Sequence, residues 1–257
     1  MKKEHLIQFS TEMSENSIRI YLRSLSAIYQ HAMKEGLAKA PNPFRGNREQ
    51  PLGSIPRQKG ALEDEELDRF VSYKPKNKSE KLGQDFFVLS LELCGANLGD
   101  ILCLRNKNIQ ESEIHFIRRK TRKSKIEISL PITRVSEILL KEYGVINQDR
   151  PDDYILPFLN GLTSEKSIDN KIHDFINKVN VGIASICEAI GIGKITTYNA
   201  RHTYAVKALD CMTAEQIQKF LGHTNVRTTD TYIKSITSSV KNTNKKVLEG
   251  MVEGWRE

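Results

Sequence analysis

The sequence predicts a mainly α-helical protein that carries one small antiparallel β-hairpin, an α+β fold class. Apolar residues recur at helical spacing along most of the chain, which predicts amphipathic helices over 14–37, 62–73, 79–94, 133–143 and 166–190. Two short segments, 114–117 and 126–130, instead have the apolar, β-branched character of strands, with alternation clearest in the second. Helix-end signals are also visible. Thr213 and Gln216 form a capping box, and Gly222 stands where a helix would end.

The length and the helix-breaking residues predict two domains. The helix over 14–37 can be capped by Ser14 or Asn16 and stopped by Gly36, and it is followed by prolines and a basic, glycine- and proline-rich stretch. We therefore expect a small helical domain over 1–46, a linker over 47–60 and a larger domain over 61–257, whose last part, 236–257, forms a tail. In the larger domain, the helix over 133–143 is expected to turn four residues inward, which are Val135, Ile138, Leu139 and Tyr143.

Composition excludes several classes of protein. The 257 residues are 39% apolar and 28% charged, as in a globular protein, and no apolar stretch reaches the length of a membrane span. No signal peptide is visible in the first 15 residues, so we expect a cytoplasmic protein. The four cysteines form no CxxC pair and are expected to be buried free thiols, and no His/Cys cluster has metal-ligand spacing. We expect no cofactor and no metal.

The distribution of positive charge indicates a partner with a phosphate backbone. The net charge is +7, and residues 1–60 hold ten Lys and Arg against five Glu. A second basic segment, 118–125, lies between the two predicted strands and has six cations in eight residues. Ordinary solvated lysines remain an alternative explanation of the charge. The candidate DNA-contacting residues are the arginines and lysines of the basic segment and two that lie off the apolar stripe of the first helix: Arg118, Arg119, Arg122, Lys123, Lys125, Arg19 and Arg23.

Three polar motifs follow one another near the C-terminus. They read Ala200-Arg201-His202-Thr203, Leu221-Gly222-His223-Thr224 and Thr229-Asp230-Thr231-Tyr232. In this order and spacing they resemble the second signature box of the tyrosine recombinases, the phage-integrase family. Gly95 to Leu102 is similar to the first signature box of the same family. The resemblance implies a tyrosine recombinase-like catalytic domain and, over 17–44, the C-terminal half of a helical core-binding domain that clamps DNA, so that the first helices of that domain are missing here.

The resemblance also implies a set of catalytic residues. Tyr232 would attack the scissile phosphate, Arg201 and His223 would neutralise its nonbridging oxygens, and Lys120 would protonate the leaving 5′ oxygen. Tyr198 stands three residues before the arginine, where the family most often has a histidine or lysine. Its phenol could contact a phosphate, although packing with a hydroxyl contact is the simpler role. His202 is expected to be structural.

One position departs from the family pattern. Asn97 stands where the first box usually has an arginine that grips the phosphate, and a branch of the family lacks this arginine and still recombines. The alternative for Asn97 is a helix cap at the turn over 95–100, a turn that Asp100 is expected to hold together. Arg118 could supply some of the missing positive charge, or it could contact a backbone phosphate.

Together these observations predict a site-specific DNA recombinase that integrates, excises or inverts DNA, as mobile elements require, through a 3′-phosphotyrosyl intermediate. The alternative is a catalytically silent relative that only binds DNA. A type IB topoisomerase or a helix-turn-helix regulator fits the motifs less well. The resemblance implies double-stranded DNA as partner and four protomers on two synapsed sites. The tail over 236–257 would dock on a neighbouring protomer or cover the protein's own surface.

Overall fold

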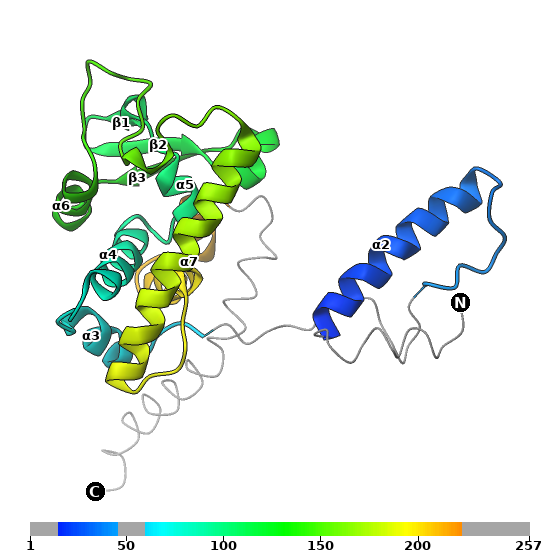
Figure 1. Cartoon of the computed structure of the whole chain (residues 1–257), viewed down its shortest axis with the longest axis horizontal. Coiled ribbons are helices and arrows are strands. Elements are labelled where there is room, and N and C mark those ends of the chain that lie inside the picture. The colour runs from blue at the N-terminus through cyan, green and yellow to red at the C-terminus, as the bar shows by residue number, and fades with distance from the viewer. Residues whose placement is uncertain (1–14, 46–59, 223–257) are drawn as a thin grey trace, which may run out of the picture. The chain divides into compact units, whose positions relative to one another are not determined.

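The computed structural model describes residues 15–45 and 60–222, which belong to two separate units (Figure 1). His223, Tyr232, the tail over 236–257 and nearly all of the expected linker lie outside the described residues. Within the described part of the chain, no helix is both long and apolar enough to cross a membrane. The two units are described one after the other.

The smaller unit contains one long helix and the segment that folds back along it. Helix α2 spans Glu15–Lys34 and ends before Gly36, which has a positive φ of 72°. The Tyr29 hydroxyl donates to the Lys39 carbonyl at 2.9 Å, and the Asn42 amide donates to the Ser26 carbonyl at 2.9 Å. These contacts fasten residues 37–45 to the helix. Because one helix cannot bury a core by itself, Ile28 remains 67% exposed.

The larger unit is a set of helices with a small sheet at one end (Figure 1). The three strands are β1 (Ile109–Gln110), β2 (Glu113–Ile117) and β3 (Glu127–Pro131), and they pair antiparallel in that order. In the register, Phe116 lies opposite Ile128. The described α-helices of this unit are α3 (Asp64–Ser72), α4 (Lys78–Glu92), α5 (Leu98–Leu102), α6 (Arg134–Tyr143), α7 (Glu165–Ile190), α8 (Thr197–Ala208) and α9 (Ala214–Leu221). The predicted fold class, mainly α with a small antiparallel sheet, is confirmed.

Helices α4 and α7 form the centre of the unit and approach each other unusually closely. A Cβ atom on Gly182 would lie 1.9 Å from the Ser79 carbonyl oxygen, and one on Gly83 would lie 2.6 Å from the Ile183 nitrogen. Glycine is therefore required at both positions, because backbone meets backbone there. The predicted apolar stripe of α7 packs into the core beside this crossing, with Phe175 and Ile183 buried. This pair of helices is the rigid frame on which the rest of the unit is built.

Helix α6 corrects one sequence prediction. Leu139 is buried as expected and Tyr143 is partly buried, but Val135 is 43% exposed and Ile138 is 53% exposed. The inward face of α6 instead uses Ser136 and Leu140 beside Leu139. The cause is its short contact with α4, which covers only one narrow side of the helix.

A buried carboxylate joins α3, α4 and α7. Glu80 is 4% exposed and accepts hydrogen bonds from the Lys76 amide at 2.7 Å, the Ser185 hydroxyl at 2.8 Å and the Tyr73 hydroxyl at 3.1 Å. These donors, the Lys76 amide first, lower the pKa of Glu80 because they favour its charged form. A lowered pKa in the folded state contributes stability above the unfolded-state pKa, and that stability is lost as the pH falls through the folded-state pKa.

We expect Glu80→Gln to lower the melting temperature by a few degrees at pH 7 and by progressively less as the pH is lowered through the acid range. The reason is that protonation of wild-type Glu80 removes the same charge. The control is Glu137→Gln, which breaks only the exposed pair with Lys141 on α6 and should change the melting temperature little. Thermal unfolding between pH 3 and 7 measures both. An equal loss at every pH would show that the charge of Glu80 is not what stabilises the fold.

Candidate active site

A pocket of about 630 Å³ brings together three of the candidate catalytic residues from distant parts of the chain, together with two of the predicted DNA-contacting arginines, Arg119 and Arg122. Asn97 comes from the start of α5, Lys120 from the segment between β2 and β3, and Tyr198 from the first turn of α8. The first half of α7 forms another wall of the pocket. Three cations line the pocket, Arg119, Lys120 and Arg122, and so do three carboxylates, Asp100, Glu165 and Asp169. The pocket can therefore receive a phosphate where Lys120 or an arginine released from its carboxylate faces it.

The wall at Asn97 is a helix start. Asn97 is the N-cap residue of α5, and its carbonyl accepts hydrogen bonds from the amides of Asp100 at 2.8 Å and Ile101 at 3.1 Å. Its side chain makes no capping hydrogen bond to the described residues. The predicted helix-cap alternative is thus correct for the position of Asn97 but does not explain why an amide side chain stands there.

The segment between β2 and β3 is a compact turn of 3-10 helix, η2 (Arg119–Ser124), rather than an extended tip. Lys120, Lys123 and Lys125 are exposed on it. The two remaining arginines of η2 are held by the first turns of α7: Arg119 pairs with Asp169 at 2.8 Å, and Arg122 pairs with Glu165 at 2.8 Å. The hydrogen bond and charge of Arg122 lower the pKa of Glu165. The sequence analysis missed these two carboxylates, although their spacing of four residues places them on one face of a helix.

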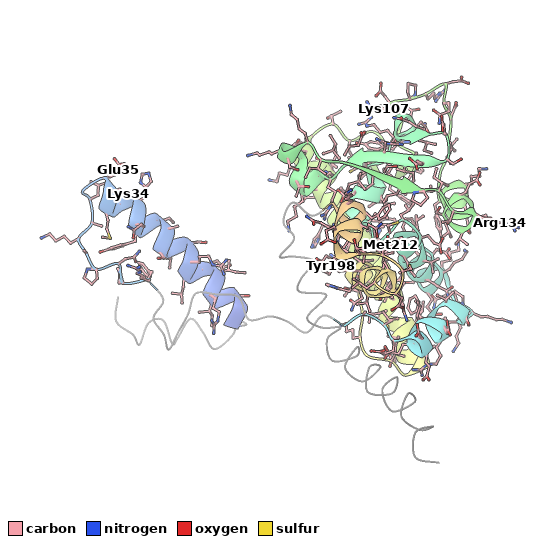
Figure 2. The ribbon with its side chains drawn as sticks, turned by 180° about the vertical axis from the view of Figure 1, so that it is seen from behind. Lys34, Glu35, Lys107, Arg134, Tyr198 and Met212 are labelled. Carbon is pink, nitrogen blue, oxygen red and sulfur yellow. The ribbon has the colours of Figure 1, made fainter. Side chains whose placement is uncertain are left out.

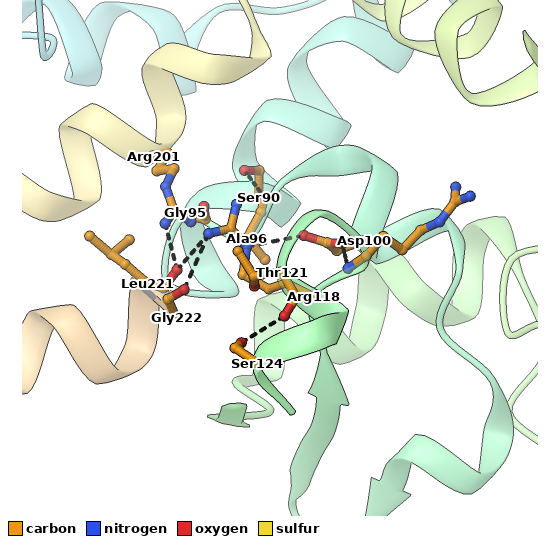
Figure 3. Close-up of polar contacts among 11 residues, drawn as sticks. Ser90, Gly95, Ala96, Asp100, Arg118, Thr121, Ser124, Arg201, Leu221 and Gly222 are labelled. Carbon is orange, nitrogen blue, oxygen red and sulfur yellow. Dashed lines mark hydrogen bonds and ion pairs between the residues drawn. The ribbon is translucent and has the colours of Figure 1, made fainter. Parts of the chain in front are cut away.

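Arg118 occupies a different place from its neighbours. Its side chain is buried, and its Nε lies 3.4 Å from Oδ2 of Asp100 while its Nη1 donates to the Leu221 carbonyl at 3.2 Å (Figure 3). The Arg119 amide donates to the other oxygen of Asp100 at 2.9 Å. Asp100 therefore fixes the beginning of η2 as well as its own turn. Arg118 does not lie on the exposed surface of the turn with the other cations of this segment.

Arg201 lies at the junction of α8, α9 and the turn before α5. It is 2% exposed, and its guanidinium donates to the Gly95 carbonyl at 3.1 Å and to the Leu221 carbonyl at 2.5 Å (Figure 3). Gly95 has a positive φ of 70°, and a Cβ atom on it would lie 2.8 Å from Cα of Arg201. A side chain at position 95 would push Arg201 out of place. The glycine of the first box is therefore required by the arginine of the second.

Helix α9 ends where the sequence predicted. Thr213 accepts from the Gln216 amide at 3.3 Å, and the Gln216 side chain accepts from the Thr213 amide at 2.8 Å, which completes the predicted capping box. Gly222 closes the helix with a positive φ of 59°. His223 is the next residue in the sequence. The predicted meeting of His223 and Tyr232 with Arg201 concerns residues outside the described range and stays a prediction.

Tyr198 and His202 stack along one side of α8. The rings meet edge to face with centroids 4.8 Å apart, and His202 is 7% exposed. Tyr198, which is labelled in Figure 2, is 40% exposed. Tyr198 thus packs against the inner histidine while its ring also lines the pocket. This arrangement agrees with the packing role expected for Tyr198 and the internal position expected for His202.

The predicted DNA-contacting residues of the smaller unit lie on α2. Arg23 lines a shallow groove of about 440 Å³ together with Arg45, Ser26, Gln30 and Asn42. Arg19 is half-buried. The lining of the groove thus includes two cations and several hydrogen-bonding groups, which are the residue types that contact phosphate backbones.

The cysteines and possible metal ligands add no further chemistry. All four cysteines are free, and burial raises the pKa of the thiols of Cys94, Cys103 and Cys187. The expectation that all four would be buried holds for Cys94 and Cys187. Cys103 is only partly buried, and Cys211 is exposed because it lies in the turn between α8 and α9. Among the described residues, no group of three His, Cys, Asp or Glu side chains could hold a metal ion.

Comparisons with known proteins agree with this geometry. The model of the phage integrase family matches residues 61–238. Among solved structures, the integrase of transposon Tn1549 in complex with a circular intermediate DNA is 15% identical, with a TM-score of 0.65 over 93% of this chain and 83% of the other. A lambda integrase dimer bound to a COC′ core site is 14% identical, with a TM-score of 0.60 over 89% of this chain and 77% of the other. A lambda integrase tetramer bound to a Holliday junction is 15% identical, with a TM-score of 0.55 over 86% of this chain and 62% of the other. A comparison with curated proteins gave no match.

Proposed function

The chain belongs to the phage integrase family, the tyrosine recombinases, and on that premise we propose that it cleaves and rejoins DNA strands at specific sites through a 3′-phosphotyrosyl intermediate. The observation that carries this proposal is the position of Arg201. Its buried guanidinium contacts the last carbonyl of α9, directly before Gly222 and His223 in the sequence. Arg201 thus contacts the residue that lies two positions before His223, although Arg201 and His223 are 22 positions apart in the sequence.

The proposed chemistry needs only groups that this chain supplies. The phenol oxygen of Tyr232 forms a bond to the scissile phosphorus as the bond from phosphorus to the 5′ oxygen breaks. Lys120 gives a proton to that leaving oxygen, while Arg201 and His223 stabilise the charge on the nonbridging oxygens. The phosphotyrosyl bond retains the energy of the broken phosphodiester. A 5′ hydroxyl from another strand can therefore reverse the step and complete strand exchange.

The missing arginine at Asn97 is the main reason to consider a second function. An amide can donate a hydrogen bond to a phosphate but carries no charge, and this favours a relative that binds DNA without cutting it. The pocket that Asn97 lines nevertheless also contains Lys120, which has no carboxylate partner among the ion pairs of the described residues and could supply positive charge there. We therefore propose an active recombinase in preference to a protein that binds DNA without cutting it.

We further propose that double-stranded DNA is the partner and that four protomers assemble on two synapsed sites, with the tail over 236–257 docking on a neighbour. The basic η2 segment and the groove at Arg23 support DNA contact by both units. The lambda integrase structures include a dimer and a tetramer on DNA. The expected division into a DNA-clamping domain over 1–46, a linker and a catalytic domain over 61–257 belongs to the same proposal.

A covalent trap on nicked suicide DNA tests the function. On a duplex that carries the cognate site, the short strand beyond the nick diffuses away after cleavage and leaves the protein joined to DNA. We expect a denaturant-resistant adduct between the full chain and the 3′ end of the cut strand. Site-specific binding without any adduct would establish the silent DNA-binding protein instead.

The two ion pairs between η2 and α7 lead to a prediction about DNA affinity. Phosphates that bind Arg119 and Arg122 must displace Asp169 and Glu165 and approach those carboxylates. Because exposed pairs are worth about 0.2–1 kcal/mol each, Asp169→Asn and Glu165→Gln should each tighten DNA binding by up to about fivefold at low salt. Titration at several salt concentrations measures the change. Glu137→Gln on α6 is the matched control for loss of one negative charge. Weaker binding by the α7 variants would mean that the pairs pre-arrange η2 for DNA rather than compete with it.

A further inference from the structure

We propose that Arg118 is a positioning residue for strand cleavage, which ties the segment that carries Lys120 to the C-terminal end of α9, immediately before His223. This inference rests on the proposed function. It assigns to Arg118 neither a direct contact with DNA nor a proton transfer. The general acid and the phosphate-binding histidine would then be held in register by one buried guanidinium.

Arg118 contacts two separate segments at once. Its partners are Asp100 in α5 at 3.4 Å and the carbonyls of Leu221 and Gly222 at the end of α9 at 3.2 and 3.5 Å (Figure 3). The Leu221 carbonyl also accepts from Arg201 at 2.5 Å. The guanidinium groups of Arg118 and Arg201 therefore both donate to the carbonyl oxygen of Leu221, two residues before His223 in the sequence.

The second argument is electrostatic. The last carbonyls of a helix have no partner within the helix and carry partial negative charge, so a cation there is stabilised and fixes the helix end. Arg118 is 8% exposed, and a buried cation needs a counter-charge. Asp100, which is 7% exposed, supplies it and also accepts from the amide of Arg119, one residue before Lys120. The start of η2 and the end of α9 are thereby held by the same ion pair.

The third argument is steric. A Cβ atom on Gly222 would lie 2.3 Å from Cδ1 of Ile128 in β3 and 2.9 Å from Cδ of Arg118. The backbone at Gly222 therefore rests directly on the aliphatic part of Arg118 and on the sheet. This contact therefore fixes the position of Gly222, and His223 is the next residue in the sequence.

The test compares DNA affinity with the rate of cleavage at saturating DNA, measured as adduct formation on the suicide substrate. We expect Arg118→Gln to lower the saturated rate about 100-fold, because a displacement of about 1 Å in a reacting group costs about that much, while DNA affinity changes less than about threefold. The matched control is Arg69→Gln. Arg69 also donates to a carbonyl at a helix end, that of Ile190 in α7 at 3.1 Å, but it does not line the pocket, and its variant should cleave as the wild type does.

If Arg118→Gln fails to fold, the variants Gly222→Ala and Gly191→Ala test the positioning role instead. Gly222 and Gly191 both close helices with positive φ, but a Cβ atom on Gly191 would meet nothing within 4 Å. Both alanine variants carry the same backbone strain, and Gly222→Ala adds the close contacts with Ile128 and Arg118, so cleavage by the two variants is compared at a temperature at which thermal unfolding shows both to be folded. Only Gly222→Ala should also lose cleavage at saturating DNA.

The outcomes separate this inference from the proposed function. If wild-type protein forms the adduct and Arg118→Gln cleaves at the wild-type rate, the positioning role is overturned and the recombinase remains. If Arg118→Gln loses affinity and cleavage in proportion, Arg118 is a DNA contact and the proposal is likewise wrong. If Gly222→Ala and Gly191→Ala cleave alike, the contact at α9 does not matter. Absence of any wild-type adduct would instead refute the proposed function.

Discussion

Tyr232→Phe is expected to abolish the covalent protein–DNA adduct while leaving binding to the site intact. The change removes one oxygen atom, which is the atom proposed to bond to phosphorus, and keeps the aromatic ring. A nucleophile cannot be replaced by better positioning of the other groups, so the expected loss exceeds that of any other single substitution. The measurement is the denaturant-resistant adduct on suicide DNA, with binding followed separately on intact duplex.

The matched control for this experiment is Tyr154→Phe. Tyr154 loses the same hydroxyl, but it lies outside the pocket and packs against the Arg105 side chain. Its variant should form the adduct at the wild-type rate. Persistence of the adduct in Tyr232→Phe would mean that another side chain attacks, and Tyr198, which lines the pocket, would then be the first residue to replace.

Lys120→Ala is expected to slow cleavage by a factor of about 10²–10⁴, the usual contribution of a positioned general acid. The loss should largely disappear on a substrate in which the leaving 5′ oxygen is replaced by sulfur. A thiol has a pKa near 8.5, so a sulfur leaving group departs without a proton, whereas an alkoxide does not. Single-turnover cleavage of the oxygen and sulfur substrates by wild-type and variant protein gives the comparison.

Lys123→Ala is the control for lost charge. Lys123 is exposed in the same short η2 turn, so its removal also takes one cation from the DNA-facing segment. If its effect is only electrostatic, it should weaken DNA binding and slow both substrates alike. If Lys120→Ala cleaves the oxygen and sulfur substrates equally slowly, Lys120 is not the general acid and acts as a phosphate contact.

The parts of the fold that depend on neighbouring residues were predictable. The capping box at Thr213 and the glycine end at Gly222 are hydrogen-bonded within four residues, so their pattern is complete in the sequence. The strands β2 and β3 were found by their residue types and by the short segment between them. Strand β1 was missed because two residues, Ile109 and Gln110, are too few to show a period.

The parts that depend on distant partners were not predictable. Arg118 was predicted as a DNA-contacting residue with the rest of the basic segment, yet its side chain is buried and binds Asp100 and the Leu221 carbonyl, 18 and 103 positions away. The prediction of the inward face of α6 was wrong for the same reason, because the exposure of Val135 and Ile138 depends on which side of α6 packs against α4. Local pattern shows that a residue is apolar or charged, but it does not show which surface covers it.

By itself, the sequence determined the kind of chemistry: an arginine, a histidine, a lysine and a tyrosine in the order and spacing of one family, on elements whose ends are marked by local hydrogen bonds. Only the tertiary structure decided which of these groups meet. Arg201 reaches the end of α9, Lys120 and Asn97 line one pocket, and Arg118 turns inward. Close approaches accompany two of these placements, since Gly95 leaves room for Arg201 and Gly222 leaves room for Arg118 and Ile128. Those approaches follow from the packing of the whole unit, and no stretch of sequence contains them.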